Sequence, residues 1–215
     1  EQVSFVDTMV DRITPSVDDP AVVRTEPFTE WVLAGSFPAG RPDWEVAGAQ
    51  FVDDVSGYEQ RKLRVLNAGH TLLACGGLAR GLTFVHEAIA APQLRQWLDE
   101  LWDEAAGTLP MSPAEIAHYR ADLIDRFANP SIRHELAKIV ADSSHKLRQR
   151  TTEVVAIRLA EGLPVTGELR SWALWLEHLR TGWTDQLDPA AAPIAARAVA
   201  DLADGATAVV EHLAP

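Results

Sequence analysis

The sequence predicts a mainly α-helical protein with a short β-containing N-terminal portion. Residues 1–55 hold five prolines among short β-prone runs, and proline at that density prevents long helices. From residue 58 onward, apolar residues recur at helical spacing in segments bounded by Gly, Pro, Asn or Ser. The composition, 47% hydrophobic and 23% charged, is that of a chain that buries a core. We therefore expect two segments, 1–55 and 56–215, of different architecture.

The N-terminal segment is expected to form extended runs at residues 3–9, 31–33 and 50–52, joined by turns. The first four expected helices cover residues 58–78, 82–90, 92–107 and 112–127. One helix is expected after Asn129-Pro130; it carries the apolar residues between 132 and 147, and residues 151–161 continue or follow it. A tryptophan-rich helix and one or two closing helices in 190–213 complete the set. The start of the helix at 112–127 is marked by an N-cap, a first-turn proline and a first-turn acid, which are Ser112, Pro113 and Glu115.

The tryptophan-rich segment carries a stripe of large apolar side chains. Its members fall at i, i+3, i+4 and i+7: Trp172, Trp175, Leu176 and Leu179. A stripe at this spacing is more often helix core than a platform for a ligand, so we expect it to be buried in the protein interior.

Charge and cysteine content exclude several classes of protein. The 19 Lys and Arg against 31 Asp and Glu give a net charge of −12, which disfavours nucleic acid and acidic membranes as partners. The single cysteine, Cys75, cannot form an internal disulfide, so a reducing, cytoplasmic setting and a buried structural thiol are expected. No apolar run is long enough to span a bilayer.

Polar side chains lie on the apolar face of the expected helix 58–78. At α-helical spacing Lys62, Asn67 and His70 sit at about 0°, 140° and 80°, on an arc shared with leucines. Burial of such groups is costly unless each finds a partner. A desolvated lysine is a candidate base, an asparagine can hold an alkoxide oxygen, and a histidine can donate to a second hydroxyl.

A structural interpretation of these three residues is equally open. Lys62 could reach solvent past apolar neighbours, Asn67 could cap a local backbone group, and His70 could be a core histidine with satisfied hydrogen bonds. Lys138, Asp142 and Lys146 fall at i, i+4 and i+8, which is typical of a solvated, ion-paired helix face.

The string Lys62-x-x-x-x-Asn67-x-x-His70 resembles the signature of the polyol-specific long-chain dehydrogenases, the family of mannitol 2-dehydrogenase, fructuronate (mannonate) reductase, altronate oxidoreductase and arabinitol dehydrogenase. Further strings match that family in order over nearly the whole chain: Met9-Val10-Asp11-Arg12-Ile13-Thr14-Pro15, Glu26-Pro27-Phe28, Gly40-Arg41-Pro42, Tyr58-Glu59, Val85-His86-Glu87, Arg126-Phe127-x-Asn129-Pro130 and Ala141-Asp142-Ser143-Ser144-x-Lys146-Leu147.

The resemblance implies a metal-independent enzyme that moves hydride between NAD or NADP and carbon 2 of a sugar alcohol or sugar acid. It implies that Lys62 is the general acid/base, and that Asn67 and His70 hold the reacting oxygen and orient the substrate. Asp11 matches a ligand of a substrate hydroxyl, and Lys146 matches a basic residue that contacts substrate. Lys138 falls where the mannitol enzymes can carry arginine.

The resemblance also implies a helical domain like the C-terminal domain of 6-phosphogluconate dehydrogenase. Members of the family begin with a Rossmann domain, yet this chain has no Gly-x-Gly-x-x-Gly between a strand and a helix. We therefore expect the chain to be the substrate-side, C-terminal portion, with residues 1–55 packing on a missing Rossmann domain that binds most of the cofactor. Alone it is expected to be inactive.

Other site classes receive little support. His86-Glu87 and His134-Glu135 lack the second histidine of a zinc-protease motif, so no metal site is predicted. Two alternatives stay open. One is a sugar-acid enzyme of the same family, with Lys138 or Lys146 meeting the substrate carboxylate. The other is a non-catalytic helical binding module.

Overall fold

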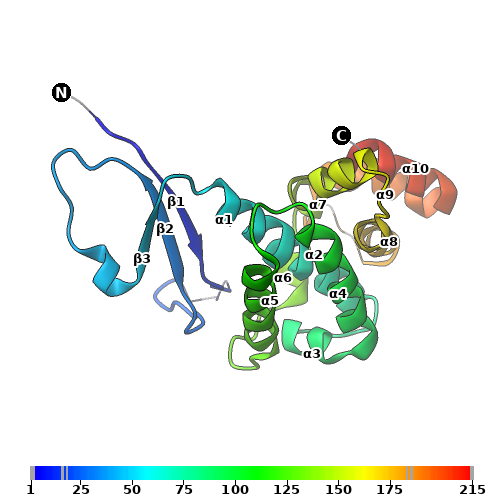
Figure 1. The fold of residues 1–215 in the computed structure, drawn as a ribbon. Helices are drawn as coiled ribbons and strands as arrows, with labels where there is room; N and C mark the ends of the chain where they lie inside the picture. The colour runs from blue at the N-terminus through cyan, green and yellow to red at the C-terminus, as the bar shows by residue number, and fades with distance from the viewer. Residues whose placement is uncertain (1–2, 16, 18, 183, 185, 214–215) are drawn as a thin grey trace. The chain divides into compact units, whose positions relative to one another are not determined.

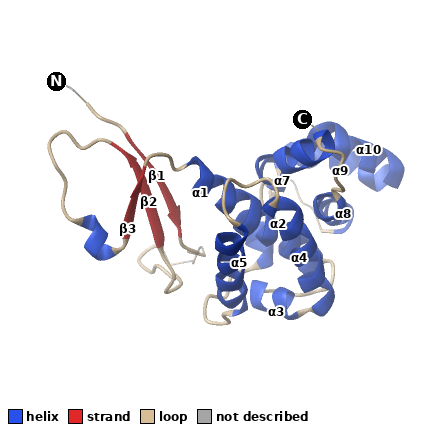
Figure 2. Cartoon of the chain, in the orientation of Figure 1, coloured by secondary structure: helices blue, strands red, loops and turns tan. Residues whose placement is uncertain are grey.

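The computed structural model describes residues 3–15, 17, 19–182, 184 and 186–213. The chain divides into two compact units, Glu1–Lys62 and Leu63–Pro215 (Figures 1 and 2). The first holds a small sheet and the second is helical, which confirms the predicted mainly α architecture with a short β-containing N-terminal portion. The boundary between these units falls inside a continuous helical stretch.

The N-terminal unit is built on a three-stranded sheet in the order β1 (Val6–Asp11), β2 (Glu30–Gly35), β3 (Ala49–Val52). Strand β2 lies in the centre, antiparallel to β1 and parallel to β3. Met9 is opposite Val32, and these two pack with Ala34 and Val55 into a small core on one face. The extended runs predicted at 31–33 and 50–52 are therefore confirmed as strands, whereas the run predicted at 3–9 is a strand only from Val6 onward.

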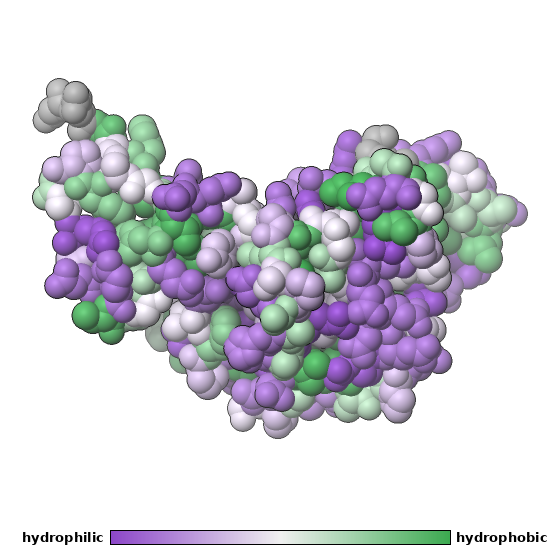
Figure 3. Space-filling model, viewed as in Figure 1, coloured by the Kyte–Doolittle hydropathy of each residue, from purple (hydrophilic) through white to green (hydrophobic). Residues whose placement is uncertain are grey.

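The other face of this sheet carries an aromatic cluster with a cation over it. Its four rings lie about 5 to 7 Å apart, in the range of favourable aromatic pairs: Trp31, Phe37, Trp44 and Phe51. The Arg41 guanidinium stands 3.5 Å above the Phe51 ring and pairs with Glu45. Hydrophobic residues gather over this unit in Figure 3, and Phe5 and Val10 are exposed.

The helical unit contains the following elements: α2 (Ala68–Leu78), α3 (Val85–Ala90), α4 (Pro92–Ala106), α5 (Pro113–Ala128), α6 (Leu136–Ile139), α7 (Ser143–Ala160), α8 (Thr166–Thr181), the 3₁₀ turn η3 (Pro189–Ala191), α9 (Ala192–Ala200) and α10 (Leu202–Leu213). The predicted start of α5 is confirmed. Ser112 and Glu115 form a capping box, and Pro113 occupies the first turn.

Helix α2 is the centre of this unit and packs against α3, α4, α6, α7 and α8. Close approach requires glycine on α2. A Cβ atom at Gly76 would lie 2.6 Å from Leu94 Cδ2, and one at Gly77 would lie 2.5 Å from Leu136 Cδ1. The glycine pair of this segment therefore serves helix packing.

The predicted core positions are confirmed. Trp172, Trp175 and Leu179 are nearly inaccessible, so the tryptophan stripe is interior. Cys75 is also buried, and desolvation raises the pKa of its thiol to about 12, so it is a structural thiol. No helix of the described chain is long and apolar enough to cross a bilayer.

The single helix predicted after Asn129-Pro130 is wrong. The chain forms the short α6, breaks at Asp142, whose φ of 53° is left-handed, and restarts as α7. The Asp188 carboxylate stabilises the first turn of α7, since it accepts from the backbone nitrogen and the hydroxyl of Ser144 at 2.7 and 2.6 Å. Lys138 and Lys146 therefore lie on different helices and do not form one ion-paired face.

A buried carboxyl group lies in the first turn of α8. Glu168 is inaccessible to solvent, and neither of its carboxyl oxygens has a hydrogen-bond partner among the described residues. Desolvation, and then the neighbouring Glu104, raise the pKa of Glu168 well above its ordinary value. Glu104 itself accepts from the backbone nitrogens of Gly167 and Glu168, at 2.8 and 3.0 Å.

We expect Glu168→Gln to raise stability at neutral pH. The folded protein keeps the Glu168 proton above pH 4.5 while the unfolded chain loses it, so the free energy of unfolding falls as pH rises from 4.5 toward the folded-state pKa. Each unit of upward shift accounts for about 1.4 kcal/mol. Urea unfolding followed at 222 nm should show a gain for the variant at pH 7.5 that disappears at pH 4.

The exposed Glu161, at the end of α7, provides the matched control. Glu161→Gln should leave the pH dependence unchanged. A Glu168→Gln protein whose stability runs parallel to the wild type from pH 4 to 7.5 would contradict a protonated Glu168.

Candidate active site

The helical stretch that carries the predicted site is one element with an irregular centre. α1 (Ser56–Arg61) and α2 are α-helical, whereas Lys62–Asn67 between them form a π-helix. In a π-helix, backbone bonds join residues five apart, and such segments are frequent at functional sites. The predicted helix 58–78 is therefore confirmed in extent but not in regularity.

Lys62 stands at the start of the π segment. Its side chain is half-buried, and its amine donates to the backbone carbonyl of Val10 in strand β1. The expectation of a fully buried amine among leucines is wrong for this structure, and Leu63 beside it is also half-buried. The amine is nevertheless held in one place by a main-chain acceptor.

Asn67 closes the π segment, and His70 follows one turn later. Asn67 is half-buried, and its backbone carbonyl accepts from Thr71 Oγ1 at 3.2 Å and from Arg150 Nη1 at 3.1 Å. The His70 ring is 6% exposed and lies 4.3 Å from the Phe127 ring and 5.0 Å from the His134 ring, centroid to centroid.

Basic groups converge around His70. Desolvation, followed by the charges of His134, Arg150 and Arg126, lowers the pKa of His70 well below 6.5, so its imidazole is neutral at pH 7. Desolvation also lowers the pKa of His134 to about 4, although the nearby Glu135 opposes this shift. Two neutral imidazoles, the buried His70 and the half-buried His134, thus lie beside cationic side chains.

Lys146 and Arg150 supply positive charge from α7. Lys146 is half-buried, and its amine donates to the carbonyls of Ile139 and Ala141 across the helix break. Its pKa is lowered by desolvation and then by Arg150, while Asp142 and Asp188 act in the opposite direction. Desolvation lowers the pKa of Arg150 to about 10.

Three buried nitrogens of this cluster have no hydrogen-bond partner among the described residues: His70 Nε2, His134 Nδ1 and Arg150 Nε. Buried donors and acceptors in proteins are almost always paired, by the protein, by water or by a ligand. Their convergence with Lys146 makes a site suited to a ligand rich in oxygen atoms.

The remaining predicted residues are on elements other than α2 and α7. Asp11 is fully buried in β1 of the N-terminal unit. Lys138 is exposed on α6, where its amine lies 3.5 Å from the Glu135 carboxylate. Within the helical unit the structure thus groups Asn67, His70 and Lys146.

Sequence reasoning missed His134 and Arg150. Arg150 follows Lys146 by four residues and so shares its face of α7, which is a signal that the sequence contained. His134 lies just before α6, outside any periodic segment, so helical spacing gives no signal for it. Among the described residues, no group of three or more His, Cys, Asp or Glu side chains could hold a metal ion.

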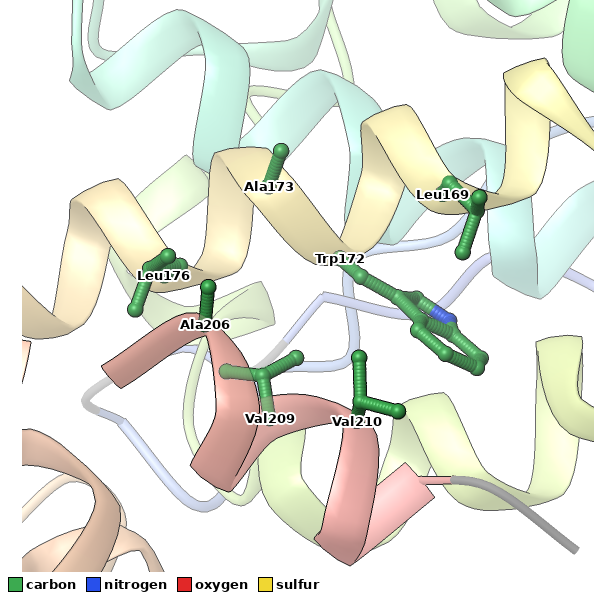
Figure 4. A pocket seen from close by; sticks show the side chains of 7 residues that line it. All are labelled: Leu169, Trp172, Ala173, Leu176, Ala206, Val209 and Val210. Carbon is green, nitrogen blue, oxygen red and sulfur yellow. The ribbon is translucent and has the colours of Figure 1, made fainter. Parts of the chain in front are cut away.

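An apolar cavity lies elsewhere in the helical unit. It measures about 130 Å³ and opens between α8 and α10 (Figure 4). Its lining is almost wholly hydrophobic and includes Trp172, Leu176 and Val209. Without polar groups to orient a substrate, this cavity does not compete with the basic cluster as a reaction site.

Family models match both parts of the chain. Residues 54–212 match the mannitol dehydrogenase C-terminal domain. Residues 1–46 match the mannitol dehydrogenase Rossmann domain. This second match includes strands β1 and β2 of the N-terminal sheet.

Two relatives illustrate the sequence similarity. D-mannonate oxidoreductase of Escherichia coli K12 is 39% identical over 178 residues, which cover 75% of this chain and 37% of that protein. Mannitol 2-dehydrogenase of Phaeosphaeria nodorum is 35% identical over 199 residues, which cover 84% of this chain and 35% of that protein. The chain thus spans well under half the length of these relatives.

A solved structure shows the same fold. It is the Pseudomonas fluorescens mannitol 2-dehydrogenase ternary complex with NAD and D-mannitol, with a TM-score of 0.84 and 30% identity over 97% of this chain and 47% of that one. The two family matches and this structural similarity agree along nearly the whole sequence. The chain belongs to the mannitol dehydrogenase family.

Proposed function

We propose that this chain is the substrate-binding and catalytic portion of an oxidoreductase that interconverts a sugar alcohol and a ketose at carbon 2, as in the pair mannitol and fructose. The observation that supports this proposal most strongly is the polar helix face of Lys62, Asn67 and His70, in a chain of the mannitol dehydrogenase family. This proposal includes no metal.

Lys62 acts as the general acid/base. In the direction of oxidation its neutral amine takes the proton of the reacting hydroxyl, and in reduction its ammonium returns that proton to the ketone oxygen. The hydrogen bond from the amine to the Val10 carbonyl supports this role, because a held amine is oriented before substrate arrives.

Asn67 and His70 hold the oxygen and the neighbouring hydroxyl. An amide N–H aimed at the oxygen stabilises the negative charge that develops as the proton leaves. A neutral His70 can both donate and accept, so it suits a hydroxyl better than an imidazolium would. We place Asp11 and Lys146 as further hydroxyl ligands, and we keep Lys138 as a peripheral candidate.

The proposed hydride carrier is NAD or NADP. A dinucleotide requires a glycine-rich loop between a strand and a helix, and the described residues contain no such loop. No residue of this chain is therefore assigned to the cofactor, which we expect to be bound mainly by the rest of a Rossmann domain.

A sugar acid such as mannonate is the second candidate substrate. The convergence of Lys146, Arg150 and Arg126 on the two histidines favours it, because a carboxylate needs charge-assisted donors and a neutral polyol does not. The similarity to D-mannonate oxidoreductase is compatible with this candidate. A non-catalytic binding module remains the alternative from another class.

Lys62→Ala should lower kcat of the full-length gene product by at least about 10²-fold, because the proton then has no acceptor in the site. Lys62→Arg should be equally impaired, since a guanidinium keeps the charge but cannot give up its proton. The assay follows NADH or NADPH with mannitol, arabinitol, mannonate and altronate. Near-normal turnover of either variant would reject the role, and a wild type inactive on every substrate would favour the binding module.

Lys146→Met separates the two substrate classes. If the sugar acid is the substrate, the wild type prefers mannonate over mannitol in kcat/KM, and the variant loses about 10- to 100-fold on mannonate alone, the value of one charge-assisted hydrogen bond. Arg148→Met on the same helix is the control, because Arg148 is exposed. A wild type that prefers mannitol would exclude the sugar-acid candidate.

A further inference from the structure

The π segment changes which face of the helix the predicted residues occupy. A π-helix advances about 82° per residue, so five steps from Lys62 bring Asn67 to about 50° and not 140°. Three α-helical steps then bring His70 to about −10°. The arc that contains all three side chains shrinks from about 140° in a regular helix to about 60°.

A π segment needs support from outside, because the change from five-residue to four-residue spacing leaves a backbone carbonyl without its amide partner. Two side chains of neighbouring helices donate to carbonyls here. Trp102 Nε1 of α4 donates to the Val65 carbonyl at 2.8 Å, and Arg150 Nη1 of α7 donates to the Asn67 carbonyl at 3.1 Å.

The bond from Arg150 is reinforced by a hydroxyl. Arg150 Nη1 also donates to Thr71 Oγ1 at 2.7 Å, and the Thr71 hydroxyl donates to the same Asn67 carbonyl at 3.2 Å. Thr71 is 1% exposed, so water cannot replace this arrangement. The carbonyl at the end of the π segment therefore has two side-chain donors joined to each other.

Arg150 is not a residue that would be expected at this position if it served only the stability of the fold. No carboxylate among the described residues pairs with it, and its Nε is shielded and without a partner. A shielded guanidinium without a counter-ion weakens a fold relative to an apolar side chain of similar size. Its two Nη1 hydrogen bonds point to the π segment as the feature that it serves.

We propose that Arg150 is a positioning residue: its guanidinium holds the π turn that ends at Asn67, and this turn sets the catalytic side chains on one face of the helix. Trp102 holds the same turn from the opposite helix. The proposal rests on the proposed function of Lys62 for its catalytic consequence, but the support of the π turn is a structural claim that stands separately.

The experiment compares three variants of the full-length gene product. Arg150→Lys keeps the charge, but the lysine side chain is one atom shorter, so its amine falls short of the two acceptors that Arg150 Nη1 reaches. Thr71→Val removes the hydroxyl between Arg150 and the Asn67 carbonyl at nearly constant volume and leaves every cation in place. Arg148→Lys, two residues from Arg150 and exposed, is the control.

Two readouts are needed. Hydrogen–deuterium exchange of residues 62–70 reports on the π turn, with residues 113–128 of α5 as the internal reference. In Arg150→Lys the amides of residues 62–70 should exchange at least about 10-fold faster than in the wild type, while exchange in α5 is unchanged.

The second readout is steady-state kinetics of Arg150→Lys. Here kcat should fall about 10- to 100-fold while KM stays within about threefold, since misplaced groups impair the chemical step more than binding. Thr71→Val should shift both readouts in the same direction by a smaller factor.

If residues 62–70 of Arg150→Lys exchange as in the wild type, Arg150 does not hold the π turn and the proposal is overturned. A change in KM without a change in kcat would also overturn it, because Arg150 would then serve the substrate directly. Unchanged exchange and kcat in Thr71→Val would overturn it as well, even where Arg150→Lys fails to fold. If the wild type oxidises none of the substrates, the proposed function fails, yet the exchange measurement still decides whether Arg150 holds the turn.

Discussion

The hydrogen bonds that hold the backbone at the end of the π segment are the constraint on which the rest of the site depends. A regular helix would spread its three polar side chains over more than a third of its circumference. Arg150 and Thr71 meet at the Asn67 carbonyl, and Trp102 meets the Val65 carbonyl. The neighbouring helices α4 and α7 therefore supply the side chains that bind these two carbonyls of the π segment.

The electrostatics of the helical unit follow from the same packing. Helices α2 and α7 and the segment before α6 bring His70 and His134 together with Lys146 and Arg150, and desolvation keeps both imidazoles neutral. Neutral histidines beside fixed cations offer donors and acceptors for hydroxyls, together with a positive field for any charge that develops on oxygen. The acidic surface of the chain, with its net charge of −12, contrasts with this basic interior cluster.

Local signals made most of the helical fold predictable, and long-range contacts explain what was missed. Ser112 and Glu115 cap α5 within three residues of each other, so the start of that helix is visible in the sequence. The carboxylate that stabilises the first turn of α7 belongs to Asp188, 44 residues from Ser144, and no periodicity reveals it. The π segment likewise depends on a contact between residues far apart in the sequence, because Arg150 lies 83 residues beyond Asn67.

The most direct measurement is a structure of the full-length protein with its cofactor and a bound substrate. We predict that the Lys62 amine and the Asn67 amide both lie within about 3.2 Å of the oxygen on the carbon that reacts. We also predict that the π segment persists. A Lys62 amine directed into solvent, with the reacting oxygen bound elsewhere, would contradict the central claim.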